Sequence, residues 1–218
     1  MDHRLPDHFS DLLLRYSQQA DAGERAAIER QLWRDYGSER AVLVVDMSGF
    51  SELTGRHGIV HYLSMVRRMQ LTAKPIIDGY EGVVLKFEAD NAFAMFPGVE
   101  AAVRAAADLN AAFARANRDT PDELDIRIAC GIDYGPILVV DQRDFFGDAV
   151  NTASKLGEDV GRPGEILLSV RAYAQCGEIA GFRSQTMQVT LKGRPLDLVR
   201  VWPAPSDRTS TVAGEAQR

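Results

Sequence analysis

Residues 83–96 read VVLKFEADNAFAMF, and this stretch carries the clearest signal for the fold. Val83–Glu88 and Ala92–Phe96 are short apolar segments rich in β-forming side chains. The residues between them, Ala89-Asp90-Asn91, are small or polar. Two such segments around a tight turn predict a β-hairpin.

Strands and helices alternate along the rest of the chain. The apolar run Ala41–Val45 predicts a fully buried strand that ends at Asp46. Helical spacing predicts a helix over 59–80 with a kink or break at Pro75, and further helices over 100–117 and 148–160. Other strands are expected at residues 125–133, 136–141, 165–169, 187–191 and 196–202. This interleaving of strands, helices and hairpins predicts an α+β sandwich with a mixed sheet.

The sequence divides into three parts. Apolar residues on either side of Gly23 predict two short amphipathic helices over 7–36, followed by a boundary at Gly37-Ser38. Residues 1–40 are therefore expected to form an N-terminal helical extension, and residues 41–203 one compact domain. The small and polar residues 204–218 are expected to be a disordered tail.

Composition restricts the class of protein. The chain has 218 residues, of which 45% are hydrophobic and 26% charged, as in ordinary soluble proteins. A net charge of −6 argues against a nucleic-acid coat or a polybasic membrane binder. The first residues do not resemble a signal peptide, and no apolar run approaches the roughly 20 residues of a membrane span. With two isolated cysteines, Cys130 and Cys176, these features predict a soluble cytoplasmic protein without disulfides.

Two aspartates stand where a strand ends in a turn. Asp46 and Asp90 would lie on adjacent strands, and two carboxylates so placed suit hard divalent cations. Either aspartate alone is more often a turn former. Asp46 is followed by Met47-Ser48-Gly49-Phe50, a glycine-containing turn into a helix, whose N–H groups suit phosphates.

Further polar residues share faces with these aspartates or with each other. Lys86 lies four residues before Asp90 on the same strand, so both are expected on one face. Asn151 and Lys155 are one helical turn apart. Glu88 either tunes Lys86 or is a solvated strand residue. His57 and His61 are also four residues apart, but without a third ligand we expect a helix-surface pair.

Taken together, these segments resemble the catalytic domain of class III nucleotidyl cyclases, the adenylyl and guanylyl cyclase family. The resemblance rests on Val44–Ser51, Lys86–Asp90, Asp144–Lys155 and Leu191–Gly193, and it extends over about residues 41–202. It implies a ferredoxin-like α/β sandwich with a mixed, mainly antiparallel sheet. It also implies a homodimer with two sites at the interface, where one subunit gives the metal-binding aspartates and the other the base-reading and ribose-positioning residues.

The resemblance implies a role for each candidate residue. Asp46 and Asp90 would bind two Mg²⁺ ions, which Mn²⁺ can replace, and the Met47 carbonyl would be a further ligand. Lys86 and Asp144 would recognise the purine. Asn151 would position the ribose, Lys155 would act on the transition state, and Lys192 would bind the terminal phosphates. Phosphate contacts are implied for Ser48, Gly49 and Phe50.

The implied reaction converts ATP to 3′,5′-cyclic AMP and pyrophosphate, for intracellular signalling. Adenine presents N1 as an acceptor and N6 as a donor, which suits a lysine and an aspartate, whereas guanine presents the reverse. Two alternatives remain: a cyclase-like regulatory module that binds nucleotide with little or no turnover, and a cyclase for GTP or a pyrimidine nucleotide. No nucleic-acid partner is expected.

Two positions depart from the family pattern. Ala89 stands where a glycine usually precedes the second metal-binding aspartate, and it is expected to constrain the turn toward negative φ. Lys155 stands where an arginine usually stabilises the transition state. Lysine keeps the charge but loses the planar fork of donors, so lower activity is expected. In the extension, apolar residues around Leu13 and Trp33 are expected to pair with the neighbouring subunit and modulate the domain.

Overall fold

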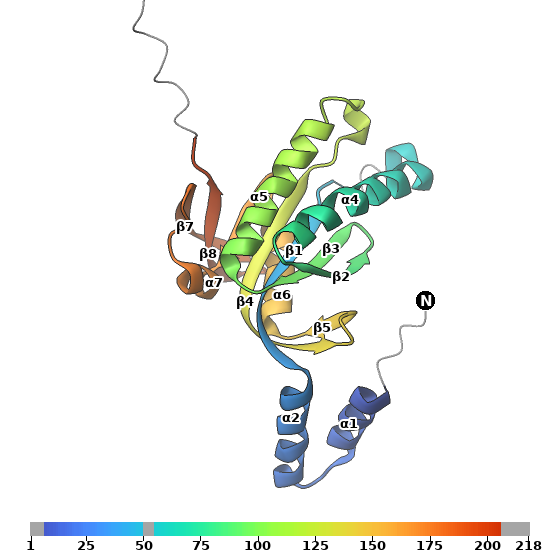
Figure 1. Ribbon diagram of the computed structural model, residues 1–218, viewed down its shortest axis with the longest axis vertical. Coiled ribbons are helices and arrows are strands. Elements are labelled where there is room, and N and C mark those ends of the chain that lie inside the picture. Colours follow the sequence, from blue (N-terminus) through green and yellow to red (C-terminus); the bar gives the residue numbers. More distant parts are fainter. Residues whose placement is uncertain (1–6, 50–54, 206–218) are drawn as a thin grey trace, which may run out of the picture.

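The computed structural model of the chain describes residues 7–49 and 55–205 (Figure 1). Its centre is an eight-stranded sheet in the order β2-β3-β1-β4-β6-β8-β7, with β5 paired to β4 outside this path. Only β4 and β6 pair in parallel, which confirms a mixed, mainly antiparallel sheet. The strands are β1 (Gly37–Met47), β2 (Val83–Glu88), β3 (Asn91–Phe96), β4 (Ile128–Val140), β5 (Asp144–Phe146), β6 (Ile166–Ser169), β7 (Phe182–Leu191) and β8 (Arg194–Pro203).

Helices cover both faces of this sheet. The longer helices α4 and α5 pack on one face, and α6 with the π-helical stretch η2 packs on the other (Figure 1). The helical elements are α1 (Asp7–Gln18), α2 (Ala22–Tyr36), α4 (Ile59–Gly79), α5 (Val99–Ala116), η1 (Asp122–Leu124), α6 (Asp148–Ser154), η2 (Lys155–Val160) and α7 (Val170–Cys176). None of the described helices is long and apolar enough to cross a membrane.

Strand β1 lies in the middle of the sheet and is buried on both faces, as its apolar run predicts. Leu43 and Val45 pack with α4 and α5, whereas Val42 and Val44 pack with α6. This alternation follows from the two-residue period of a strand. Asp46 continues the second set and therefore belongs to the face that carries α6, which we call the α6 face.

The predicted hairpin is present and is tighter than expected. Glu88 pairs with Asn91, so the turn contains only Ala89 and Asp90, and Asn91 already belongs to β3. Ala89 has a φ of 51°. The expectation of a negative φ at this residue was wrong, because a two-residue turn between twisted antiparallel strands favours left-handed backbone even where the residue is alanine.

Strand β4 is continuous where two strands were expected. Its outer edge pairs with β6 at Cys130–Ile132 and with β5 at Leu138–Val140. Pro136 falls between these two segments, in a stretch where this edge has no ladder partner. The short elements β5 and α7 were not predicted as such, and α4 runs through Pro75 to Gly79 without a break.

The N-terminal helices α1 and α2 pack against the end of β4 and against β5 of the same chain. Phe9, Leu12, Ile28 and Leu32 form a cluster with Val140. In addition, the Phe9 and Phe146 rings stack with centroids 6.1 Å apart. These apolar residues therefore find their partners within one chain.

The helical extension leads directly into the sheet. β1 begins at Gly37, four residues before the expected start of the domain, with no linker after α2. A Cβ atom at Gly37 would lie 2.1 Å from the Trp33 carbonyl oxygen, which explains the glycine. Leu13 and Trp33 are each 39% exposed, so their pairing with another subunit stays a prediction. Residues 206–218 of the predicted tail lie outside the described residues.

Candidate active site

The two predicted metal-binding aspartates come together at neighbouring strand ends. Asp46 is the penultimate residue of β1 and is paired with Asn91, which directly follows Asp90. The Met47 N–H donates to the Asp90 carbonyl oxygen at 3.2 Å, which ties the end of β1 to the turn. Both carboxylates are only partly exposed. The register of β1 with β3 thus positions this pair.

The electrostatics of the pair favour a bound cation. Burial, reinforced by the charges of Asp90 and Glu158, raises the pKa of Asp46 to about 7. Burial also raises the pKa of Asp90. Two half-buried carboxylates oppose each other's ionisation, whereas a divalent cation between them stabilises both charges. The donor set consists of hard oxygen atoms, so these residues fit Mg²⁺ or Mn²⁺.

The turn after Met47 is only partly described. The Ser48 N–H donates to the Arg127 carbonyl oxygen at 2.9 Å, so this amide is already engaged. Gly49 has a φ of +85°, and nothing lies within 4 Å of the position that a Cβ would take. Phe50 lies outside the described residues. A phosphate role for this turn stays a prediction.

The predicted base-reading pair is formed within one chain. Lys86 Nζ lies 3.1 Å from Asp144 Oδ1 and 3.3 Å from Glu88 Oε2. The ammonium also lies over the Phe93 ring, 5.2 Å from its centroid. Burial opposes the charge, but the bonds to Asp144 and Glu88 outweigh it and raise the pKa of Lys86. Glu88 therefore contacts Lys86, although its own side chain is 68% exposed.

Asn151 and Lys155 lie on the same exposed side of α6. The Lys155 N–H donates to the Asn151 carbonyl oxygen, so the two residues keep α-helical spacing although η2 begins at Lys155. Both side chains are exposed. They are therefore accessible to a molecule that approaches the α6 face from outside.

Glycines allow η2 to lie directly on the sheet. A Cβ atom at Gly131 of β4 would lie 2.1 Å from the Ala153 carbonyl oxygen and 2.4 Å from the Gly157 nitrogen. This close approach brings Glu158 within electrostatic range of Asp46 and Asp90. Glu158 was missed as a site residue, although its place three residues after Lys155 offered a weak signal.

Lys192 occupies the turn between β7 and β8. Lys192 and Gly193 both have positive φ, 50° and 79°, as a two-residue hairpin turn requires. The Lys192 side chain is 81% exposed and lies 3.7 Å from Asp159 of η2. A surface ion pair of this kind is weak, so the lysine remains available to an incoming phosphate.

The two histidines of the predicted pair lie next to each other around the start of α4. The His57 and His61 rings stack with centroids 4.6 Å apart, and His61 Nε2 lies 2.7 Å from the Glu123 carbonyl oxygen. Within residues 7–49 and 55–205, no three or more His, Cys, Asp or Glu side chains gather in a way that suits one metal ion. Cys130 is buried and Cys176 partly buried, and both are free thiols.

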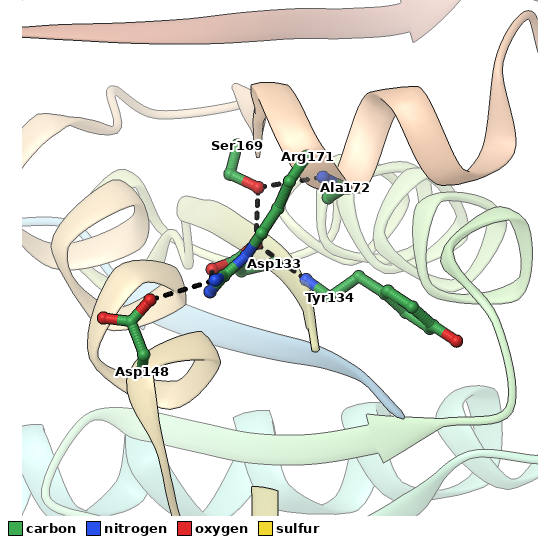
Figure 2. A network of polar contacts seen from close by, with 6 residues as sticks. All are labelled: Asp133, Tyr134, Asp148, Ser169, Arg171 and Ala172. Atoms are coloured by element: carbon green, nitrogen blue, oxygen red, sulfur yellow. Dashed lines mark hydrogen bonds and ion pairs between the residues drawn. The ribbon is translucent and has the colours of Figure 1, made fainter. Parts of the chain in front are cut away.

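A polar network centred on the buried Asp133 joins α6 and α7 to the sheet (Figure 2). Asp133 of β4 is fully buried and accepts hydrogen bonds from Arg171 Nε at 2.8 Å, from the Tyr134 N–H at 2.7 Å and from the Ser169 hydroxyl. The same guanidinium contacts Asp148, at the start of α6, at 3.0 Å. This network was not predicted, because its members come from distant parts of the sequence.

Comparison with known proteins agrees with this arrangement. The description "Adenylate and Guanylate cyclase catalytic domain" matches residues 38–202, most of the chain. A curated protein of Rhizobium meliloti (strain 1021), named "Putative adenylate cyclase 3", is 33% identical over 129 residues. That match covers 59% of this chain but only 22% of the relative.

Solved structures show the same fold. The adenylyl cyclase CyaB from P. aeruginosa superimposes with a TM-score of 0.65 at 22% identity, covering 78% of this chain and 98% of CyaB. The "Adenylate/Guanylate Cyclase/Hydrolase" from Silicibacter pomeroyi gives a TM-score of 0.62 at 28% identity, covering 78% of this chain and 98% of that protein. The similar structures include both adenylyl and guanylyl cyclases. The chain therefore belongs to the class III adenylyl and guanylyl cyclase family, as a catalytic domain.

Proposed function

We propose that this domain is an adenylate cyclase that converts ATP to 3′,5′-cyclic AMP and pyrophosphate. The observation that carries this proposal is the pairing of Lys86 with Asp144 at 3.1 Å. A lysine donor suits adenine N1, and an aspartate acceptor suits the N6 amino group. Guanine would place a donor against the lysine and an acceptor against the aspartate, which leaves charged groups without partners.

Asp46 and Asp90 would hold two Mg²⁺ ions per site, with the Met47 carbonyl as a further ligand, and Mn²⁺ could replace them. When bound, such ions supply Lewis-acid activation of the ribose 3′-hydroxyl and neutralise charge on the triphosphate. In the reaction, a bond forms between the 3′-oxygen and the α-phosphorus while the bond to the leaving pyrophosphate breaks. The proton of the 3′-hydroxyl would pass to water.

The remaining residues would bind and orient the substrate. Asn151 would donate to the ribose, Lys155 would contact the phosphate oxygens that gain charge in the transition state, and Lys192 would bind the terminal phosphates. The exposure of Asn151 and Lys155 supports a site completed by a second subunit, because neither side chain is enclosed by its own chain. We propose a homodimer with two shared sites.

A second candidate function follows from Lys155. Loss of the arginine fork at this position favours a nucleotide-binding regulatory module with little or no turnover. A third candidate is a cyclase for GTP or a pyrimidine nucleotide. The structural similarity to a guanylyl cyclase is the reason to test the GTP form of this candidate. The Lys86–Asp144 pair argues against this third candidate.

A turnover assay separates these functions. The purified chain is incubated with ATP, GTP, CTP or UTP and with Mg²⁺ or Mn²⁺, and cyclic products are quantified. We expect cyclic AMP from ATP, and at least about tenfold less cyclic product from the other nucleotides. Nucleotide binding without cyclic product under either metal would favour the regulatory module, and faster turnover of GTP would overturn the choice of substrate.

A further inference from the structure

Asn91 lies beside the two metal-binding aspartates. It is the first residue of β3, directly after Asp90, and it is paired with Asp46 across the antiparallel ladder. Residues that face each other in such a ladder place their Cβ atoms about 5 Å apart on the same face of the sheet. The Asn91 side chain is therefore an immediate neighbour of the Asp46 carboxylate.

The packing of β1 and β3 confirms that Asp46 and Asn91 lie on the α6 face of the sheet. Phe93, two residues after Asn91, packs in the same cluster as Val42, Val44 and the alanines of α6. Asp46 follows Val44 at the same two-residue spacing. Asp46 and Asn91 thus both belong to the α6 face, independently of the pairing register.

The amide oxygen of Asn91 has no partner. Oδ1 is buried, with less than 1 Å² accessible, and it finds no hydrogen-bond donor in the described part of the chain. Buried amide oxygens normally accept at least one hydrogen bond. A buried acceptor that receives no hydrogen bond from the described residues is open to a bound cation or a water molecule.

The surroundings favour a cation as the missing partner. The polar groups nearest in the ladder and the turn, Asp46, Asp90 and Glu88, are carboxylates, which donate nothing when ionised. The Lys86 ammonium is already held by Asp144 and Glu88. In the described residues, carboxylates alone do not form a three-ligand group for one ion, so a neutral oxygen would add a ligand that the site lacks.

We propose that Asn91 is a further ligand of the divalent cation site and that its Oδ1 binds the cation held by Asp46 and Asp90. Amide oxygens are suitable ligands for hard divalent cations, alongside carboxylates and backbone carbonyls. This inference rests on the proposed function, because it requires Asp46 and Asp90 to bind a metal. It adds a neutral ligand, which increases coordination without adding a third negative charge.

The test is a binding measurement without nucleotide or turnover. Mn²⁺ is added to the 218-residue chain, and free Mn²⁺ is followed by electron paramagnetic resonance. Asn91→Ala should weaken Mn²⁺ binding about tenfold. Asn91→Asp keeps an oxygen in place and adds charge, so it should bind Mn²⁺ at least as tightly as the wild type. Asn110→Ala, on α5 across the sheet, is the matched control and should bind like the wild type.

A second measurement distinguishes weaker Mn²⁺ binding from misfolding of a variant. The melting temperature of each variant is measured with and without Mn²⁺, since a ligand that binds only the folded state raises it according to its affinity. Wild-type affinity in Asn91→Ala, together with lost binding in Asp46→Ala, would overturn the inference and leave the proposed function standing. Weakened binding in Asn91→Asp would also overturn it, because the amide N–H would then be the group required. A wild-type chain that binds no Mn²⁺ would overturn the proposed metal site itself.

Discussion

The carboxylate pair and the base-reading pair lie on the same face of one sheet, yet their charges are balanced differently. Lys86 is neutralised within the chain by Asp144 at 3.1 Å and by Glu88 at 3.3 Å. The charges that act on Asp46 are those of Asp90 and Glu158, and burial raises the pKa of both Asp46 and Asp90. The proposed purine-reading half of the site is thus preassembled, whereas the proposed metal-binding half would be neutralised by a cation from solution.

Removing either of the two carboxylates proposed to bind metal should have the largest effect. Asp46→Ala and Asp90→Ala should each reduce cyclic AMP formation by at least about 10³-fold, because metal-ion catalysis contributes several kcal/mol. The melting temperature without metal should fall little, since burial disfavours the charged form of both carboxylates. Normal cyclic AMP production in either variant would contradict the cyclase mechanism.

Lys155 should have the next largest effect. Lys155→Ala should lower kcat by about 10²-fold with little change in KM, because a donor that acts in the transition state contributes little to ground-state binding. Lys155→Arg should raise kcat by restoring the planar fork of donors. Steady-state kinetics with ATP and Mn²⁺ measure both variants. Equal kcat in wild type and Lys155→Ala would remove Lys155 from the mechanism.

Disrupting the Lys86–Asp144 pair should change the selectivity between ATP and GTP more than the rate of cyclisation. Lys86→Ala removes the donor to adenine N1 and leaves Asp144 without its ion pair, so the preference for ATP over GTP should fall about tenfold. The ratio of kcat/KM for the two nucleotides measures this change. The variant Lys74→Ala, which removes an exposed ion pair with Asp78 on α4, is the control and should keep the wild-type ratio. An unchanged ratio in Lys86→Ala would show that the purine is read elsewhere.

The smallest effect concerns stability without metal. Because the pKa of Asp46 is raised from 3.8 to about 7, the folded chain binds this proton more tightly than the unfolded chain. Stability in EDTA should therefore fall as pH rises from about 4 through about 7, and Asp46→Asn should flatten this slope. Thermal unfolding as a function of pH measures both. Asp119→Asn, at an exposed position after α5, should keep the wild-type profile, and an unchanged slope in Asp46→Asn would contradict the assignment.

Local patterns predicted much of the fold and singled out several residues of the candidate site, while their roles came from the family resemblance. The hairpin of β2 and β3 was predictable because strand propensity and a short polar turn agree. The Lys86–Asp144 contact followed only from the family resemblance, since no local rule relates a residue of β2 to one of β5. Strand β4 was divided in two because Gly135-Pro136 resembles a turn, and only the pairing partners on each side show why the proline is tolerated.

Other parts of the site depend on tertiary packing. Glu158 approaches Asp46 because Gly131 and Gly157 let η2 lie against the sheet, and such a close approach has no periodic signature. Asn91 was expected to be part of the turn, and only the register with β1 places it opposite Asp46. The network around Asp133 joins residues up to 38 positions apart. These contacts require the three-dimensional arrangement.

The most direct test of the account is mixing two inactive variants. Asp46→Ala chains lack the metal half of the site and Asn151→Ala chains lack the ribose contact, so a mixed dimer has one site with both lesions and one with none. After subunit exchange at equal amounts, we predict recovery of about a quarter of wild-type cyclic AMP formation, because half of the dimers are mixed and each has one intact site. No recovery, although exchange is demonstrated, would contradict a site built from the carboxylates of one chain and the α6 residues of another.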